Sequence, residues 1–319
     1  MKLLFVLMSM FTFTFANYVE LYRVSGIDAV KDTFERVLQT KSYWDDTLKN
    51  KDVRYGYYES IDAVLLCTKS NKELTLYKKE KNKFAKSFSS EVLIGKKNGD
   101  KKKEGDLKTP VGVYKLTQRL TKVDPFYGPL ALVTSYPNVY DKVKKKTGYG
   151  IWIHGLPKNQ KRDNFTRGCV ALDNGRLETL NSKFDYKKSI LILSEKEQKL
   201  ITKDDISKIL SQIYQWKSAW ENSELDKYIS FYSKDFKNLN GLNLNKFKKR
   251  KARIFKRSKD KKIYIKNINI SPYPSMKNES LFRIIMDEDY KAKYYKFKGK
   301  KELYVRLNSN GKISILTED

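Results

Sequence analysis

His154 and Cys169 are the residues of this chain whose types and spacing best suit covalent catalysis. His154 is the only histidine among 319 residues, and Cys169 follows it by fifteen positions in the run Thr166-Arg167-Gly168-Cys169-Val170. A thiol becomes a strong nucleophile at neutral pH mainly when a base or a cation lowers its pKa, and imidazole is the usual partner for this task. The pair therefore predicts a nucleophile, Cys169, activated by a general base, His154.

Each member of the pair also has a structural interpretation. His154 could be a strand residue bonded to a backbone carbonyl, and Cys169 a small buried apolar residue, as many unpaired cysteines are. Cys67 is the only other cysteine, so a disulfide-stapled scaffold is not expected, although a single Cys67–Cys169 bridge is a competing arrangement. One histidine and two well-separated cysteines do not make a zinc site, and we expect neither a metal nor a cofactor.

The amino terminus has the pattern of a secretory signal peptide. Lys2 supplies a positive charge, the residues from Leu3 to Phe15 are mostly apolar, and Ala16 offers a small residue at a cleavage point. This apolar stretch is too short to span a bilayer as a helix, and no later segment reaches the roughly eighteen apolar residues that a span needs. We expect cleavage near Ala16, a mature chain without an integral membrane segment, and a location in the periplasm.

The chain carries a formal charge of +29, much of it in lysine-rich segments. Clustered lysine and arginine are the electrostatic signature of nucleic-acid binding, but export removes that partner from consideration. The remaining interpretations are contact with anionic envelope polymers or carboxylate-rich peptides, and a solvated lysine surface without a ligand.

The elements that must position His154 and Cys169 fall in the middle of three regions. Residues 17–60 show apolar side chains at helical spacing but are too few for a core of their own, so this region should pack on a neighbour or on a second copy. Residues 61–196 change to short apolar runs separated by turn residues, and Asp173 is placed to cap a helix through Leu177 and Leu180. The expected strands of this mainly β domain are Ala63–Cys67, Leu74–Tyr77, Val92–Ile94, Val111–Leu116, Ile151–Ile153 and Ile190–Leu193.

Residues 200–319 begin with helical patterns and end with alternating ones. Thr202 or Asp204 should cap a first helix whose apolar face ends at Trp220, and a second helix should run from Leu225 to Tyr232. Helices followed by a curled antiparallel sheet predict an α+β cone. Its expected strands, after a basic segment, are Ile263–Ile270, Leu281–Met286, Tyr294–Phe297, Leu303–Leu307 and Ile313–Leu316.

Three blocks of this sequence together resemble the L,D-transpeptidase (YkuD) catalytic domain family. They are the glycine-bearing segment from Gly105 to Tyr114, the pair His154-Gly155, and the signature Thr166-Arg167-Gly168-Cys169-Val170. The resemblance covers about Ile61 to Glu195. With the helical region before it and a region similar to the NTF2-like fold after it, the chain resembles the helical-cell-shape peptidoglycan L,D-carboxypeptidases of epsilonproteobacteria.

This resemblance implies a reaction and a set of site residues. Cys169 would attack the carbonyl that joins the L-centre of diaminopimelate to the terminal D-alanine of a stem tetrapeptide, with His154 moving the proton. The carbonyl of Gly155 would orient the imidazole. The backbone N–H groups around Gly168 and Cys169 would bind the oxyanion, and Thr166, which opens the signature, would lie beside them.

Two further side chains are expected near the substrate. Arg167 stands where many family members have histidine, and Ala171 stands where many have arginine. The Arg167 guanidinium could bind a substrate carboxylate through two charge-assisted hydrogen bonds, or could remain solvated and favour the thiolate through space. Trp152 should share a strand face with His154 and either wall the pocket or belong to the core.

The residues do not decide whether water or an amine resolves the acyl-enzyme. The expectation of hydrolysis to tripeptides, and of an influence on cell shape, follows from the three-part architecture. An L,D-transpeptidase with the same catalytic residues is the alternative, and a non-catalytic peptidoglycan-binding protein is an alternative of another class. Expected partners are peptidoglycan stem peptides and a second copy of the chain, contacted through residues 17–60.

Overall fold

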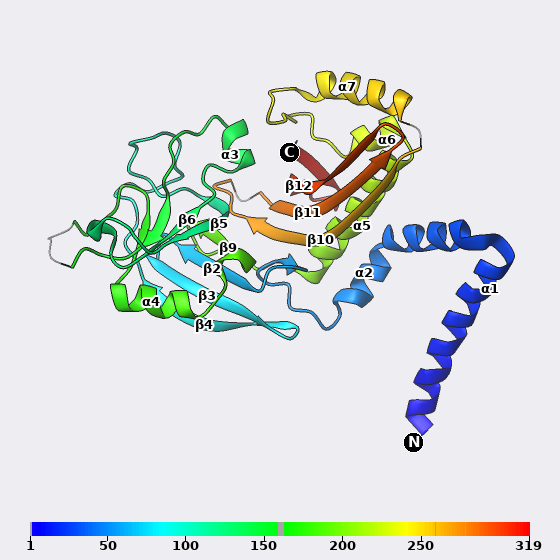
Figure 1. Cartoon of the computed structure of the whole chain (residues 1–319), viewed down its shortest axis with the longest axis horizontal. Helices are drawn as coiled ribbons and strands as arrows, with labels where there is room; N and C mark the ends of the chain where they lie inside the picture. Colours follow the sequence, from blue (N-terminus) through cyan, green and yellow to red (C-terminus); the bar gives the residue numbers. More distant parts are fainter. Residues whose placement is uncertain (1, 159–162, 259, 278) are drawn as a thin grey trace.

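The structure, a computed structural model, describes residues 2–158, 163–258, 260–277 and 279–319, with side chains from Asn17 onward. Met1 and the side chains of the expected signal peptide lie outside the described part. Two β-sheets form the body of the molecule, and the amino-terminal helix extends away from them (Figure 1). The helices of the described chain are α1 (Lys2–Leu38), α2 (Lys41–Leu48), α3 (Val139–Val143), α4 (Asn174–Ser182), α5 (Lys203–Glu221), α6 (Leu225–Ser230) and α7 (Leu244–Arg257).

The first sheet has eight strands in the order β4-β3-β2-β9-β5-β6-β7-β8. Most neighbours are antiparallel, whereas β9 runs parallel to β2 and β8 runs parallel to β7. Its strands are β2 (Ala63–Thr68), β3 (Glu73–Glu80), β4 (Lys83–Glu91), β5 (Gly112–Leu120), β6 (Ala131–Thr134), β7 (Trp152–His154), β8 (Val170–Ala171) and β9 (Ser189–Ser194). Leu65, Leu74 and Leu191 are among the side chains that form its apolar core.

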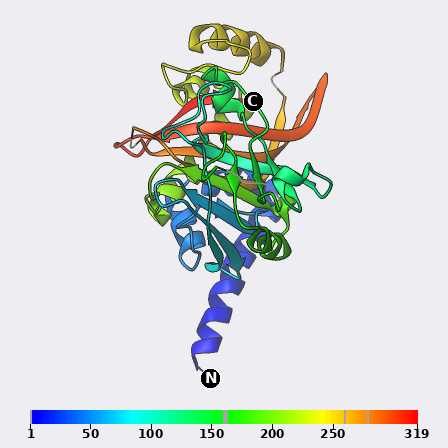
Figure 2. The same ribbon diagram turned by 90° about the vertical axis from the view of Figure 1, so that its left-hand side faces the viewer.

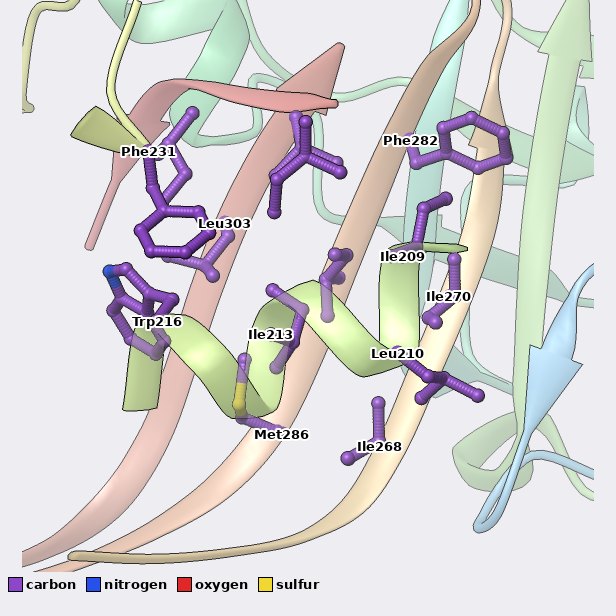
Figure 3. Close-up of a cluster of buried hydrophobic side chains, with 14 of the residues drawn as sticks. Ile209, Leu210, Ile213, Trp216, Phe231, Ile268, Ile270, Phe282, Met286 and Leu303 are labelled. Atoms are coloured by element: carbon purple, nitrogen blue, oxygen red, sulfur yellow. The ribbon is translucent and has the colours of Figure 1, made fainter. Parts of the chain in front are cut away.

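The second sheet has five strands in the order β1-β10-β11-β12-β13, and α5 packs against one face of it. Figure 3 shows Ile209, Ile213 and Trp216 of this helix directed at side chains of the sheet. The helix begins at a capping box. The Thr202 side chain accepts from the N–H of Asp205, and the Asp205 side chain accepts from the N–H of Thr202. The strands are β1 (Tyr57–Tyr58), β10 (Lys262–Tyr273), β11 (Leu281–Ala292), β12 (Tyr295–Leu307) and β13 (Ile313–Glu318).

The amino-terminal region packs on this second sheet. Trp44 and Leu48 of α2 are buried in the same apolar cluster as α5. The short strand β1 pairs antiparallel with β10, so that Tyr57 lies opposite Ile270. The eight-stranded sheet is therefore inserted, in sequence, between two parts of the five-stranded one.

The two sheets share an interface that contains apolar and polar contacts. Tyr140 of α3 stacks on Tyr304 of β12 with ring centroids 5.1 Å apart. Asn138 donates to the hydroxyl of Tyr273 at 3.2 Å, and Arg283 donates to the carbonyl of Val113 at 3.2 Å. Figure 2, turned by 90° from Figure 1, shows the five-stranded sheet lying across the end of the first.

The expected fold class, a mainly β catalytic domain with a helical amino-terminal region and an α+β cone, is confirmed. Two expectations about strands were wrong. Val92–Ile94 is not a strand, because the chain leaves the sheet after Glu91 and only Leu93 forms an isolated bridge to Ala171. The two expected strands Tyr294–Phe297 and Leu303–Leu307 fall in one strand, β12, which begins after the turn residue Tyr294. The basic segment before β10, to which the sequence assigned no element, forms helix α7. Among the described residues, no helix is both long enough and apolar enough to cross a membrane.

Candidate active site

Parallel pairing of β7 with β8 brings His154 and Cys169 together. Ile153 lies opposite Val170 and His154 opposite Ala171, so Cys169 enters the pair directly beside the histidine strand. Neighbouring strands run about 4.8 Å apart. The His154 side chain is buried, at 1% exposure, and Cys169 is half-buried. The sequence expectation that these two residues meet is consistent with this register.

The ring of His154 is oriented by the backbone of the next residue. Its Nδ1 lies 2.7 Å from the carbonyl oxygen of Gly155. A carbonyl only accepts hydrogen bonds, so Nδ1 carries a proton and the lone pair of the neutral ring is on Nε2. This tautomer is the one that a base acting through Nε2 requires.

Tyr127 contacts both His154 and the residue after it. Its carbonyl accepts from the N–H of Gly155 at 2.9 Å. Its ring meets His154 edge-on at a centroid distance of 5.0 Å and Trp152 at 5.1 Å. Trp152 is half-buried. The Tyr127 ring therefore lies against both Trp152 and the candidate base, His154.

Asn174, the first residue of α4, fastens the chain after Gly155. Its Oδ1 accepts from the N–H of Leu156 at 2.8 Å, and its Nδ2 donates to the carbonyl of Leu156 at 2.9 Å. A Cβ atom on Gly155 would lie 2.1 Å from Asn174 Oδ1, so only glycine fits this position. Asp173 caps the helix by accepting from the N–H of Arg176, as expected from the sequence.

The turn that carries Cys169 is closed by Thr166. The Thr166 hydroxyl accepts from the N–H of Gly168 at 3.0 Å and donates to the carbonyl of Cys169 at 2.7 Å. Gly168 has φ of 138°, where a side chain would be strained, and the Sγ of Cys169 lies 3.4 Å from the carbonyl oxygen of Gly150. Thr166 therefore shapes the turn, and the Gly168 N–H is bonded within it.

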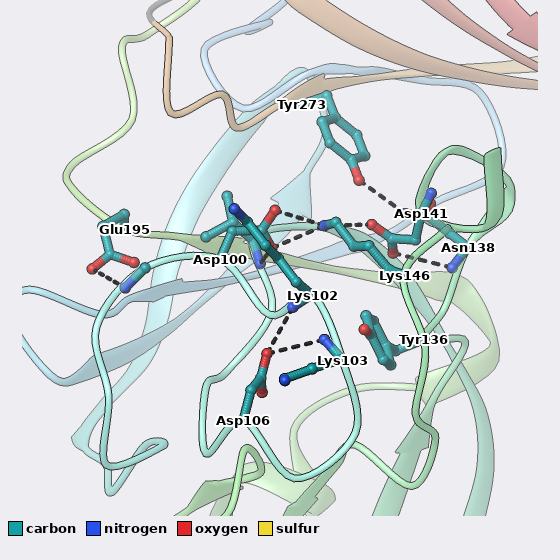
Figure 4. Close-up of polar contacts among 12 residues, drawn as sticks. Asp100, Lys102, Lys103, Asp106, Tyr136, Asn138, Asp141, Lys146, Glu195 and Tyr273 are labelled. Atoms are coloured by element: carbon teal, nitrogen blue, oxygen red, sulfur yellow. Dashed lines mark hydrogen bonds and ion pairs between the residues drawn. The ribbon is translucent and has the colours of Figure 1, made fainter. Parts of the chain in front are cut away.

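The glycine-bearing block from Gly105 to Tyr114 contacts this same turn. A Cβ atom on Gly168 would lie 2.8 Å from the carbonyl oxygen of Lys108, which shows how closely the two blocks approach. Asp106 folds the block by accepting from Nζ of Lys101 at 2.8 Å and from the N–H of Lys102, also at 2.8 Å. Burial raises the pKa of Asp106, but these hydrogen bonds outweigh burial and hold the pKa well below its usual range. Figure 4 shows Asp106 facing Lys102 and Lys103, with Lys146 between Asp100 and Asp141 on the side nearer the second sheet.

Arg167 and Cys67 are the other residues that the sequence singled out. Arg167 is exposed to solvent at the rim of the turn. Cys67 is fully buried in the first sheet, which raises the pKa of its thiol to about 12, and both cysteines are unbridged. The competing Cys67–Cys169 disulfide is therefore absent. In the part of the chain that the structure describes, no group of three or more His, Cys, Asp or Glu residues could hold a metal ion.

Sequence reasoning missed Tyr127 and Asn174. Tyr127 precedes a Gly128-Pro129 step, a pattern typical of a fixed turn, and Asn174 directly follows the expected cap. These signals indicate local structure but not contact with a histidine strand.

Two family models match the chain. The model of the L,D-transpeptidase catalytic domain matches residues 62–192, and that of the Cds6 C-terminal NTF2-like domain matches residues 208–319. A curated relative, the putative L,D-transpeptidase YafK of Escherichia coli K12, is 26% identical over 138 residues, 43% of this chain. That match spans only 46% of the relative's length.

Solved structures match more of the chain. The helical cell shape determining protein Pgp2 from Campylobacter jejuni is 43% identical with a TM-score of 0.83, covering 88% of this chain and 99% of that one. A point mutant of Pgp2 gives 43% identity and a TM-score of 0.85 over 89% of this chain and 99% of that one. Bdellovibrio bacteriovorus Bd1075, at 24% identity and a TM-score of 0.66 over 84% of this chain and 96% of its own, shares the fold. The chain therefore belongs to the family of Pgp2-like cell shape proteins, in which an L,D-transpeptidase catalytic domain is joined to a C-terminal NTF2-like domain.

Proposed function

We propose that the protein is an exported peptidoglycan L,D-carboxypeptidase that removes the terminal D-alanine from stem tetrapeptides and so influences cell shape. The observation that carries this proposal is the pairing of β7 with β8, which sets Cys169 beside an imidazole held by the Gly155 carbonyl. Membership of the Pgp2-like family supports peptidoglycan as the substrate.

The reaction begins with proton transfer from the Cys169 thiol to Nε2 of His154. The thiolate attacks the carbonyl carbon, and the oxyanion is stabilised by backbone N–H groups at Gly168 and Cys169, of which the Gly168 N–H must first leave Thr166. His154 returns the proton to the amine of the departing D-alanine. Water, activated by the same imidazole, then hydrolyses the thioester and frees the tripeptide.

Arg167 and Trp152 are assigned to the substrate in this proposal. Arg167 is exposed beside Cys169, and its planar guanidinium suits the carboxylate of D-alanine or of diaminopimelate. Trp152 and Tyr127 would form the apolar wall next to His154.

The test is mass spectrometry of purified tetrapeptide muropeptides incubated with the mature chain. We expect tripeptide and free D-alanine, and no product with Cys169→Ala. Cys67→Ala is the matched control, since it removes the buried thiol and should leave the products unchanged. EDTA should also leave the rate unchanged.

The runner-up function is transpeptidation, which the match to an L,D-transpeptidase model favours. A new cross-linked dimer in the same assay would select it over hydrolysis. Unchanged tetrapeptide, together with retention of the protein on purified sacculi, would instead indicate a non-catalytic binding protein.

The remaining expectations belong to the same proposal. Cleavage near Ala16 would release residues 17–319 into the periplasm, with the catalytic domain over residues 61–196 and the NTF2-like domain over residues 200–319. Residues 17–60 would contribute to a homodimer.

A further inference from the structure

The free end of the β11–β12 hairpin gathers exposed aromatic rings. The two strands are joined through the turn residues Lys293 and Tyr294, and Ala292 pairs with Tyr295. Tyr294 is 83% exposed, Tyr295 is 60% exposed and Phe297 is 37% exposed. In Figure 2 this hairpin projects beyond the neighbouring elements at the upper right, in orange-red. Large rings at a projecting tip contribute little to the core of the protein and suit contact with another surface.

Lysines lie beside Tyr294 and on the face of the hairpin opposite to Tyr295 and Phe297. Lys262 pairs with Lys291, and Lys291 pairs with Lys296, so the three ammonium groups lie on one face of adjacent strands. The turn adds Lys293, whose ammonium lies 5.1 Å from the centre of the Tyr294 ring. The exposed lysines on that face of β10, β11 and β12 are Lys262, Lys266, Lys291, Lys296, Lys298 and Lys300.

Two carboxylates on this face compensate only part of the charge. Asp289 lies 3.6 Å from Lys291 and 3.5 Å from Lys298, and Asp287 pairs with Lys300. Lys262, Lys293 and Lys296, which lie nearest the tip, keep a net positive charge there, beside Tyr294.

We propose that this hairpin tip docks the protein on the surface of an anionic phospholipid bilayer. Tyrosine is enriched at the level of lipid headgroups, where its ring contacts acyl chains and its hydroxyl contacts water. Lysines near a negatively charged leaflet add electrostatic attraction, which makes the binding sensitive to salt. The shape supports a bilayer, since a projecting tip can enter a soft interface, whereas small polar ligands are usually bound in concave sites.

The opposite face of the same strands belongs to a different feature. Tyr290, Tyr295 and Phe297 line a pocket that also contains Trp220 and Arg250. Tyr294 and Lys293 do not line this pocket, so substitutions at these two residues test the tip separately from the pocket.

The experiment is co-sedimentation of the mature chain with vesicles. One set contains phosphatidylcholine alone and the other contains about 30% phosphatidylglycerol in phosphatidylcholine. We expect binding only to the anionic vesicles, and release when the salt concentration is raised to about 1 M. Lys293→Glu with Lys296→Glu should weaken binding at least about tenfold. Tyr294→Ser, which leaves the charge unchanged, should weaken it severalfold.

The matched control is Lys81→Glu with Lys83→Glu at the tip of the β3–β4 hairpin. This tip has the same kind of two-residue connection and exposed lysines, and the charge change is identical. Equal loss of binding in both double variants would show diffuse attraction by the overall charge and would overturn the proposal. So would an absence of binding to anionic vesicles.

A parallel assay with purified sacculi tests whether the hairpin tip binds peptidoglycan instead of a bilayer. If the hairpin variants lose retention on sacculi while no form of the protein binds vesicles, the tip recognises peptidoglycan and the membrane proposal is wrong. All variants should hydrolyse muropeptides at the unsubstituted rate, because the tip lies outside the candidate active site. This readout distinguishes a failure of the docking proposal from a failure of the proposed enzyme function.

Discussion

His154 is oriented by a backbone carbonyl and by an aromatic ring. The Gly155 carbonyl selects the tautomer, and Tyr127 holds the ring from the side. Such an arrangement needs glycine at position 155, because Asn174 occupies the space of a side chain there. At the scale of single residues, the activity should therefore depend on the groups that hold the imidazole in place.

Tyr127 provides a direct test of this dependence. Tyr127→Phe keeps the ring edge against His154 and should retain near-normal kcat/KM. Tyr127→Ala removes the ring and frees the imidazole to rotate, so we expect kcat to fall by about tenfold to a hundredfold. Steady-state kinetics on tetrapeptide muropeptides measures the difference. Equal activities of the two variants would show that the ring has no positioning role.

At the scale of elements, the turn of Cys169 and the loop folded by Asp106 behave as one unit. Lys108 follows Asp106 by two residues and its carbonyl closely approaches Gly168. The hydrogen bonds to Asp106 therefore fix the surroundings of the nucleophile as well as their own loop.

Asp106 should make stability depend on pH in the acid range. Its folded pKa lies below the ordinary value of 3.8. The stabilising contribution is therefore complete above that value and is lost as the pH falls below it. Asp106→Asn should cost about 2 kcal/mol of unfolding free energy at pH 7, and the gap to the unsubstituted protein should narrow toward about pH 3. Urea unfolding at several pH values checks this. A gap that does not change with pH would contradict the assignment.

The sequence predicted those elements whose signals are local. Thr202 and Asp173 cap helices as expected, and the strands around Leu65 and Leu191 follow from continuous apolar runs between turn residues. Helix α7 was missed because its many lysines and arginines obscured the buried positions Phe247 and Phe255. Tyr127 and Asn174 could not be assigned to the site, because their contacts join residues far apart in sequence.

At the scale of the whole molecule, a buried arginine of the five-stranded sheet links the two sheets through one hydrogen bond. Arg283 donates to both carboxylate oxygens of Glu302, at 2.9 and 3.1 Å, and also to the Val113 carbonyl of the catalytic domain. The Arg283 side chain is buried, and its hydrogen bond to Val113 exists only while the two domains remain in contact.

Removing this cation should uncouple the domains. For the unsubstituted chain we expect a single calorimetric transition. Arg283→Met leaves the Glu302 carboxylate buried without its partner, so we expect a loss of about 3 kcal/mol and two separated transitions. Arg306→Met, which breaks a more exposed pair with Glu279, is the control and should cost under about 1 kcal/mol. A single transition in both variants would show that the apolar contacts alone couple the domains.

The exposed apolar side chains of α1 bear on the proposed homodimer. Val24 is 67% exposed and Ile27 is 64% exposed, on a segment that extends from the body of the molecule. Ile27→Asp should shift the mature chain toward monomer in sedimentation equilibrium, because burial of the carboxylate in an apolar interface is costly. Ser25→Asp adds the same charge at a polar position and should not. If the unsubstituted mature chain sediments as a monomer, the proposed homodimer is wrong.

The pairing of β1 with β10 has a consequence for the order in which the protein is completed. Tyr57 and Tyr58 are synthesised before the catalytic domain, but their strand partners, Ile270 and Asn269, come about two hundred residues after these tyrosines. The catalytic domain can close once β9 is made, since domains generally fold as units during synthesis. The helical region and β1 then remain uncovered until α5 and β10, their packing and pairing partners, are made. A nascent chain of this protein thus holds a finished catalytic domain between two unfinished halves of its neighbour.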